Sequence, residues 1–133
     1  MAGARAERRL AAILAADVVG FSRLMEADEA GTLAALKARR AKILDPLVAE
    51  FGGRIVKVMG DGVLVEFASA VNAVQCAIEM QRETGAANAA LPEAGRIALR
   101  IGVNLGDVIV EGGDLYGDGV NVAARLEALA APE

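Results

Sequence analysis

The fold is decided by residues 54–67, which read RIVKVMGDGVLVEF. Two runs rich in Val, Ile and Leu flank the pair Gly60-Asp61. Such β-branched runs favour strands, and a two-residue turn that contains glycine is typical of a hairpin. We therefore predict strands over 54–58 and 62–67, joined as an antiparallel β-hairpin.

The residues before this hairpin predict a buried strand and a long helix. Residues 10–19 form an apolar run, which indicates the strand. Apolar residues then recur at helical spacing over 28–51, with Asp28 as the N-cap and Gly52-Gly53 as the stop. Pro46 lies inside this pattern and should kink or split the helix, because proline lacks the backbone N–H that a helix interior needs.

The residues after the hairpin predict a second helix over 70–83, capped by Ser69. One side of it is expected to carry Ala70, Val74, Ala77, Ile78 and Gln81. Residues 84–95 are predicted as a loop, 96–104 and 107–111 as strands around a Leu105-Gly106 turn, 112–119 as a glycine-rich loop and 120–130 as a third helix.

The predicted order, β–α–ββ–α–ββ–α, indicates an α+β fold with a ferredoxin-like sheet and helices on one face. The chain stops at the end of a predicted helix, so we expect that C-terminal strands of the sheet are missing and that the sequence is truncated. Residues 1–9 are interpreted as a basic N-terminal tail and residues 10–133 as one domain. A secretory leader is the less favoured interpretation of the N-terminal segment, because Asp17 directly follows its short apolar run.

Composition narrows the classes of function. The chain has 133 residues and a formal net charge of −4, so no basic field indicates a nucleic-acid partner. No run reaches the ~18 apolar residues of a membrane span, which predicts no direct membrane contact in this segment. The single cysteine, Cys76, cannot form an internal disulfide and fits a cytoplasmic protein. The absence of histidine excludes a histidine general base and a histidine-ligated zinc site.

Two acidic residues stand where apolar runs break. Asp17 follows the first predicted strand, and Asp61 lies in the hairpin turn. A carboxylate at the end of a buried strand is costly unless it meets a cation or several hydrogen-bond donors. The pair therefore indicates a site for hard divalent cations that handle phosphates, although turn or cap aspartates beside glycine explain the same pattern.

Other polar residues stand in apolar surroundings. Phe21 and Ser22 begin a helix at a turn whose backbone N–H groups could hold phosphate oxygens. Lys57 lies on the hairpin, where its side chain could also extend to solvent. Asn121 and Arg125 are four residues apart and share one face of the third helix. Taken alone, Phe21, Ser22 and Lys57 favour an ordinary structural role. Asn121 and Arg125 could form an ordinary polar face or contact the sugar and phosphate of one ligand, and their apolar neighbours are unusual for a solvated face.

Four ordered motifs give a more specific indication. They are ADVVGFS at 16–22, GRIVKVMGDG at 53–62, RIGVNLG at 100–106 and DLYGDGVNVAARL at 114–126. Together they resemble the catalytic domain of class III nucleotidyl cyclases, which are adenylate and guanylate cyclases. The resemblance covers nearly all of residues 10–130 and is closest to bacterial adenylate cyclases.

The resemblance implies a cation and phosphate site. Asp17 and Asp61 would bind two divalent cations, Mg²⁺ or Mn²⁺, with help from the backbone carbonyl of Val18. Phe21 and Ser22 would lie where backbone amides meet the triphosphate of ATP.

It also implies the remaining substrate contacts and a dimer. Lys57 and Asp114 would recognise the purine, a pairing that suits adenine because guanylate cyclases typically carry Glu at the lysine position. Asn121 would orient the ribose, and Arg125 would stabilise charge in the transition state. The aspartates come from one subunit and the other four residues from its partner, so a homodimer with two shared sites is implied.

The implied activity is adenylate cyclase, which converts ATP to 3′,5′-cyclic AMP and pyrophosphate. The alternative is a non-catalytic nucleotide-binding or dimerisation module of the same fold. A diguanylate cyclase, suggested by Gly112-Gly113-Asp114, is not favoured because Leu115-Tyr116 follows. The family's phosphate-contacting lysine lies past Glu133, so we expect the 133-residue chain alone not to be fully active.

Overall fold

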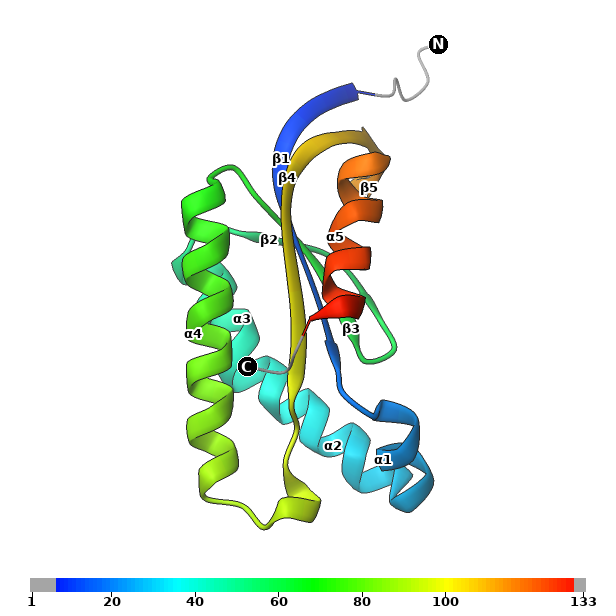
Figure 1. Ribbon diagram of the computed structural model, residues 1–133, viewed down its shortest axis with the longest axis vertical. Coiled ribbons are helices and arrows are strands. Elements are labelled where there is room, and N and C mark those ends of the chain that lie inside the picture. The colour runs from blue at the N-terminus through cyan, green and yellow to red at the C-terminus, as the bar shows by residue number, and fades with distance from the viewer. Residues whose placement is uncertain (1–6, 131–133) are drawn as a thin grey trace.

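The protein forms an antiparallel five-stranded sheet, shown in Figure 1. The computed structural model describes residues 7–130, the side chain of Ala94 excepted, so residues 1–6 of the predicted tail lie outside it. The spatial order is β2-β3-β1-β4-β5. The strands are β1 (Glu7–Val18), β2 (Arg54–Met59), β3 (Gly62–Phe67), β4 (Leu99–Glu111) and β5 (Asp114–Tyr116).

Strand β1 is central because both of its faces are apolar. Its residues 11–16 are all buried, and it pairs with β3 on one side and β4 on the other. One set of alternating residues (Ala12, Leu14, Ala16, Val18) joins a core with the helices between β1 and β4, and the other (Ala11, Ile13, Ala15) joins a core with the C-terminal helix. The strand begins at Glu7, three residues earlier than predicted.

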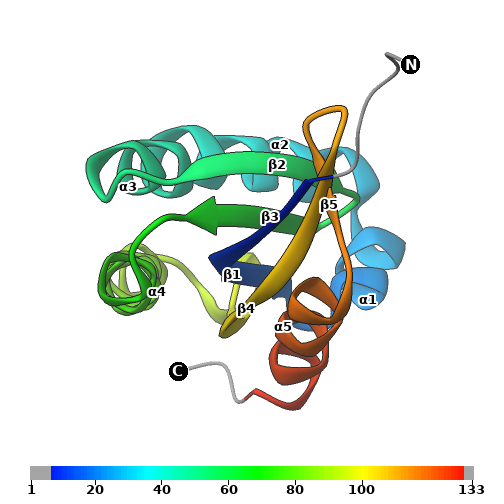
Figure 2. The same cartoon turned by 90° about the horizontal axis from the view of Figure 1, so that it is seen from above.

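The sheet curls so that its two outermost strands meet, as Figure 2 shows for β2 and β5. The Arg54 guanidinium on β2 donates a 3.0 Å hydrogen bond to the carbonyl oxygen of Gly113, which lies just before β5. The curl places residues that are 59 positions apart side by side. It follows the twist that antiparallel strands adopt.

The predicted helix 28–51 is split into several segments. They are α2 (Glu29–Arg39), the π-helical segment η1 (Arg40–Leu44) and α3 (Asp45–Glu50), and a separate short helix, α1 (Phe21–Ala27), precedes them. Asp28 caps α2 as predicted, since its Oδ1 accepts a 3.0 Å hydrogen bond from the Gly31 amide. The split expected at Pro46 occurs just before it, where the Asp45 amide bonds to the Arg40 carbonyl and Pro46 enters the first turn of α3.

Helix α4 (Ala70–Ala89) is longer than predicted. The Ser69 cap is confirmed, because its Oγ accepts a 3.1 Å hydrogen bond from the Asn72 amide. The loop prediction for 84–89 is wrong, since Asn88 anchors the last turn through two hydrogen bonds to the Ile97 backbone, at 2.7 and 3.0 Å. The buried side of α4 carries Ala73, Cys76, Met80 and Thr84, whereas Val74 and Ile78, which the sequence places together on one side, are half exposed.

The segment after α4 contains the short 3₁₀ turn η2 (Glu93–Gly95) and then β4. The predicted turn at Leu105-Gly106 is wrong, because β4 runs unbroken and pairs these residues with Ala12 and Ala11 of β1. The glycine-rich loop contains the short strand β5, and the last helix is α5 (Asp118–Leu129).

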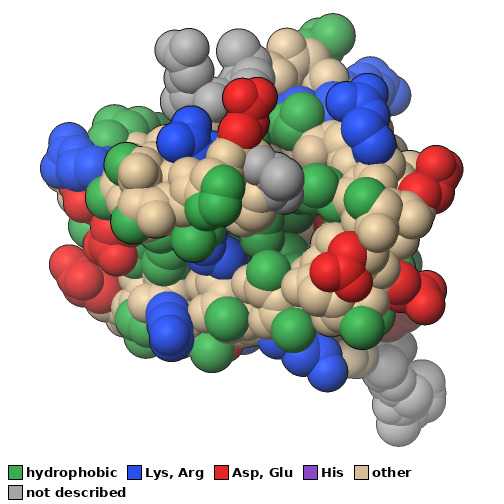
Figure 3. Space-filling model, turned by 90° about the horizontal axis from the view of Figure 1, so that it is seen from below, with side chains coloured by type: hydrophobic (Ala, Val, Ile, Leu, Met, Phe, Trp, Pro, Cys, Tyr) green, Lys and Arg blue, Asp and Glu red, His purple; other side chains and the backbone are tan. Residues whose placement is uncertain are grey.

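The predicted α+β, ferredoxin-like fold class is confirmed, with one refinement. The helices do not all lie on one face, because α2 to α4 pack on one face of the sheet and α5 packs on the other (Figure 1). Viewed from below in Figure 3, the surface mixes acidic and basic side chains.

Candidate active site

The structure brings Asp17 and Asp61 together. Asp17 stands near the end of β1, and Asp61 lies in the tight turn between β2 and β3, where Gly60 adopts φ of 60°. Antiparallel pairing of Ala16 with Val63 carries that turn to the end of β1. The Val18 amide donates a 3.0 Å hydrogen bond to Asp61 Oδ2. Two carboxylates from separate segments therefore converge at one end of the sheet.

An arginine that the sequence reasoning missed also lies at this point. Arg100 on β4 is directly opposite Asp17 in the strand register. Its Nε donates to Asp17 Oδ1 and its Nη2 to Oδ2, both at 3.1 Å. This two-pronged geometry orients the Asp17 carboxylate and raises the pKa of Arg100, chiefly through the hydrogen bond and then through the charge of Asp17. Its position opposite Asp17 becomes visible only once the β1–β4 register is known.

A second missed residue is Glu127 on α5. Its side chain is 13% exposed, and its Oε2 lies 3.5 Å from Arg100 Nε. Burial, followed by the nearby charge of Asp17, raises the pKa of Glu127 to about 7. The site thus holds three carboxylates and one guanidinium.

This surplus of acidic groups fits a divalent cation. Magnesium is usually bound through one or two carboxylates, with phosphate and water completing the shell, and Asp17 and Asp61 supply that number. Within residues 7–130 no group of three or more Asp, Glu, Cys or His side chains is arranged to enclose a cation. The residues present therefore match an open site that a triphosphate completes, rather than a closed structural site.

Glycines on β4 and α5 bring that helix against the sheet. A Cβ on Gly102 would stand 2.6 Å from the Ala123 carbonyl oxygen and would meet the Glu127 amide nitrogen. A Cβ on Gly119 would stand 2.6 Å from the carbonyl oxygen of Asp107. Backbone therefore contacts backbone along α5, and this contact fixes where Glu127 and the helix's polar residues lie.

The predicted pair Lys57 and Asp114 is also brought together. Lys57 Nζ lies 3.0 Å from Asp114 Oδ1 and 3.2 Å from Oδ2, across the junction of β2 and β5. The hydrogen bond from Lys57 is the main reason that the pKa of Asp114 is lowered. The Tyr116 ring lies beneath the lysine, with its centroid 5.6 Å from Nζ, which the sequence reasoning did not predict.

The other predicted residues lie on α5 and at the start of α1. Asn121 and Arg125 are exposed on α5, and neither makes a side-chain hydrogen bond with the described residues. Phe21 begins α1 after Gly20 (φ of 66°) and packs partly against the core, while Ser22 is exposed. One chain therefore assembles the acidic cluster and the lysine–aspartate pair, whereas Asn121 and Arg125 belong to neither.

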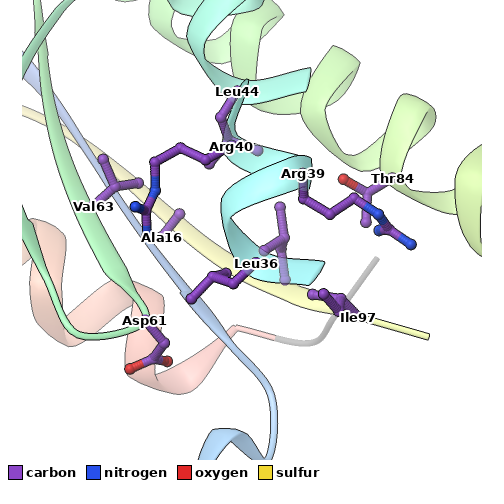
Figure 4. A pocket seen from close by; sticks show the side chains of 10 residues that line it. Ala16, Leu36, Arg39, Arg40, Leu44, Asp61, Val63, Thr84 and Ile97 are labelled. Atoms are coloured by element: carbon purple, nitrogen blue, oxygen red, sulfur yellow. The ribbon is translucent and has the colours of Figure 1, made fainter. Parts of the chain in front are cut away.

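Two hollows border Asp61. The larger, a groove of about 290 Å³, lies between the β2–β3 hairpin and α5 and is bordered by Asp17, Lys57, Asp61 and Glu127. The smaller, of about 20 Å³, lies between α2 and the sheet and has room for about one water molecule (Figure 4). In Figure 4 the Arg39 and Arg40 side chains point to opposite sides of this mostly apolar pocket. Its size excludes a nucleotide, so the groove is the candidate substrate surface.

Comparison with known proteins identifies the family. Residues 6–133 match the family described as "Adenylate and Guanylate cyclase catalytic domain". The chain belongs to this family of cyclase catalytic domains. The finding agrees with the resemblance carried by the four motifs.

Individual relatives agree with this assignment. The chain is 62% identical over 132 residues to "Putative adenylate cyclase 3" of Rhizobium meliloti, and 41% identical over 127 residues to an adenylate cyclase of Streptomyces coelicolor. Those matches cover 99% and 93% of this chain, but only 22% and 31% of the two relatives.

A solved structure matches the fold. The crystal structure of an adenylate/guanylate cyclase/hydrolase from Silicibacter pomeroyi superposes with a TM-score of 0.90 at 50% identity, covering 96% of this chain and 74% of that one. This likeness confirms the cyclase fold. Among the described helices of this cyclase domain, none combines the length and the apolarity needed to cross a membrane.

Proposed function

We propose that this cyclase domain acts as an adenylate cyclase, which forms 3′,5′-cyclic AMP and pyrophosphate from ATP. The observation that carries the proposal is the convergence of Asp17 and Asp61, with the Val18 amide hydrogen-bonded to Asp61, beside a groove of about 290 Å³. The reaction is attack of the ribose 3′-hydroxyl on the α-phosphate. The 3′-O–P bond forms as the bond to the leaving pyrophosphate breaks.

The acidic residues would hold the cofactor. Asp17, Asp61 and the carbonyl of Val18 would bind Mg²⁺ or Mn²⁺, two ions per site, which would neutralise phosphate charge and favour ionisation of the 3′-hydroxyl. Phe21 and Ser22, at the start of α1, would offer backbone N–H groups to the triphosphate. These residues need only bind and align, because in-line displacement at phosphorus depends mainly on position and charge.

The lysine–aspartate pair supports adenine as the base. The Lys57 ammonium is a donor and the Asp114 carboxylate, whose pKa is lowered, is an acceptor at neutral pH. Adenine offers an acceptor at N1 and a donor at its N6 amino group, whereas guanine offers the opposite at N1 and O6. The pair is therefore complementary to ATP rather than to GTP.

The position of Asn121 and Arg125 supports a homodimer. Both side chains are exposed on α5 and border no part of the aspartate groove. A second copy, docked so that its Asn121 and Arg125 face Asp17 and Asp61, would complete the site. Asn121 would then orient the ribose, and Arg125 would stabilise negative charge in the transition state.

The test is cyclic AMP formation from ATP with Mn²⁺, measured on the full-length protein that contains this domain. We expect turnover that Asp17→Asn abolishes while the circular dichroism spectrum is unchanged. ATP binding without any cyclic AMP would instead support the second candidate, a nucleotide-binding or dimerisation module. Because the substrate is ATP, we place the domain in the cytoplasm.

A further inference from the structure

We propose that Glu127 is a positioning residue that receives the Arg100 guanidinium when a divalent cation binds to Asp17. The inference rests on the proposed cation site and adds a role for two residues outside its ligands. The Arg100 guanidinium is the positive charge that moves, and the divalent cation is the one that takes its place at Asp17. Two observations carry the inference: Arg100 occupies both oxygens of Asp17, and a buried carboxylate oxygen of Glu127 lies within ion-pair distance of Arg100 without a hydrogen bond to it.

The first observation creates a conflict. With Nε and Nη2 at 3.1 Å from the two Asp17 oxygens, Arg100 occupies the carboxylate that a cation would need. A guanidinium cannot lose its proton near neutral pH, so it must move to relieve repulsion from the incoming charge. Arg100 is partly buried, so after this movement it stays paired only if another acceptor lies nearby.

The second observation supplies that acceptor. Glu127 Oε2 is buried and has no hydrogen-bond partner among the described residues, yet it lies only 3.5 Å from Arg100 Nε. A small rotation of the Arg100 side chain would turn this contact into a charge-assisted hydrogen bond. Such a bond is shorter and stronger than one between neutral groups.

Glu127 itself is held in place. The backbone of α5 lies directly on Gly102, so the helix cannot move closer to the sheet or slide past it without strain. The charged groups that face Glu127 are Asp17 from β1, Asp61 from the hairpin turn and Arg100 from β4. Among them Arg100 is the cation, and it lies within ion-pair distance of the Glu127 carboxylate.

The experiment measures Mn²⁺ binding without nucleotide, by the electron paramagnetic resonance signal of free Mn²⁺. The full-length protein is compared with Glu127→Gln, with Arg100→Gln and with the double variant. We expect Glu127→Gln to weaken Mn²⁺ binding about tenfold, on the order of one charge-assisted hydrogen bond. Arg100→Gln should tighten binding, and adding Glu127→Gln to it should change the affinity less than about threefold, because the two residues act as one unit.

We call the movement of the Arg100 guanidinium from Asp17 to Glu127 the relay. Controls distinguish the relay from a simple loss of negative charge at Glu127. Glu111→Gln makes the same substitution at the exposed far end of β4 and should leave Mn²⁺ affinity unchanged. Unfolding curves confirm that each variant is folded. An equal loss from Glu127→Gln with and without Arg100 would overturn the proposal, and so would unchanged affinity in Glu127→Gln.

The same Mn²⁺-binding measurements distinguish a failure of the proposed cation site from a failure of the relay alone. If wild type and Asp17→Asn bind Mn²⁺ equally weakly, the cation site itself is wrong and the relay is refuted with it. If Asp17→Asn abolishes binding while Glu127→Gln has no effect, the cation site stands and only the relay is refuted.

Discussion

Replacing Gly102 with alanine should displace α5 and so damage both stability and turnover. The new Cβ would stand 2.6 Å from the Ala123 carbonyl oxygen, whereas ordinary contact begins near 3.4 Å. The helix must therefore move by at least about 0.8 Å or the strand must bend, because both contacting groups are backbone and the Glu127 amide nitrogen lies closer still. Overpacking of this kind costs about 1–3 kcal/mol of unfolding free energy.

The same displacement should reduce catalysis. Helix α5 carries Asn121 and Arg125, and a shift near 1 Å in positioning groups can lower turnover about 10²-fold. Urea unfolding and cyclic AMP formation in the full-length protein measure the two effects.

Gly85→Ala is the matched control. Gly85 lies in the interior of α4 with nothing within 4 Å of the added Cβ, so this change should stabilise the protein by about 0.5–1 kcal/mol. If Gly102→Ala unfolds at the wild-type urea concentration and keeps wild-type turnover, the close backbone contact between β4 and α5 does not exist as described.

Three further changes test other contacts. Lys57→Glu places two carboxylates together at the Asp114 pair and should lower the ratio of kcat/KM for ATP over GTP at least about tenfold; an unchanged ratio would remove Lys57 from purine recognition. Burial, with a smaller effect of Glu50, raises the pKa of Cys76 from 9.0 to about 11, so the unfolded thiol ionises first and stability should fall as pH rises from 9. Cys76→Ala should remove about 2 kcal/mol of that loss at pH 11, and identical pH profiles of the two proteins would contradict the assignment. Ser69→Ala removes the α4 cap and should lower the free energy of unfolding, measured in urea, by about 1 kcal/mol. An unchanged free energy of unfolding would mean that the cap hydrogen bond does not form.

Much of the fold follows from local patterns in the sequence. Alternating apolar runs and a glycine turn define the 54–67 hairpin, and the Asp28 and Ser69 caps mark two helix starts. The errors come from tertiary contacts that override local signals. Gly106 resembles a turn residue, yet it lies within an unbroken strand because α5 approaches it closely, with the Gly119 Cα 3.3 Å from where its Cβ would be. Asn88 resembles a loop residue, yet it anchors a helix end.

The site was predictable where motifs carry its chemistry. Asp17 and Asp61 stand out because they interrupt apolar runs, whereas Lys57 and Asp114 are linked only by the resemblance to the cyclase family. The structure brings each pair together. Arg100 and Glu127 were missed because each resembles an ordinary surface charge until the β1–β4 register and the docking of α5 are known. Their contact is a property of the assembled sheet and helix, not of any one segment.

If two protomers share each site, as proposed, mixing two inactive variants should restore activity. Asp17→Ala and Asn121→Ala full-length proteins are assayed for cyclic AMP formation separately and after co-refolding. Random pairing makes half of the dimers mixed, and each mixed dimer keeps one complete site, so about a quarter of wild-type activity should return. If the mixture stays as inactive as its parts while dimers still form, Asp17 and Asn121 do not serve one site from two chains.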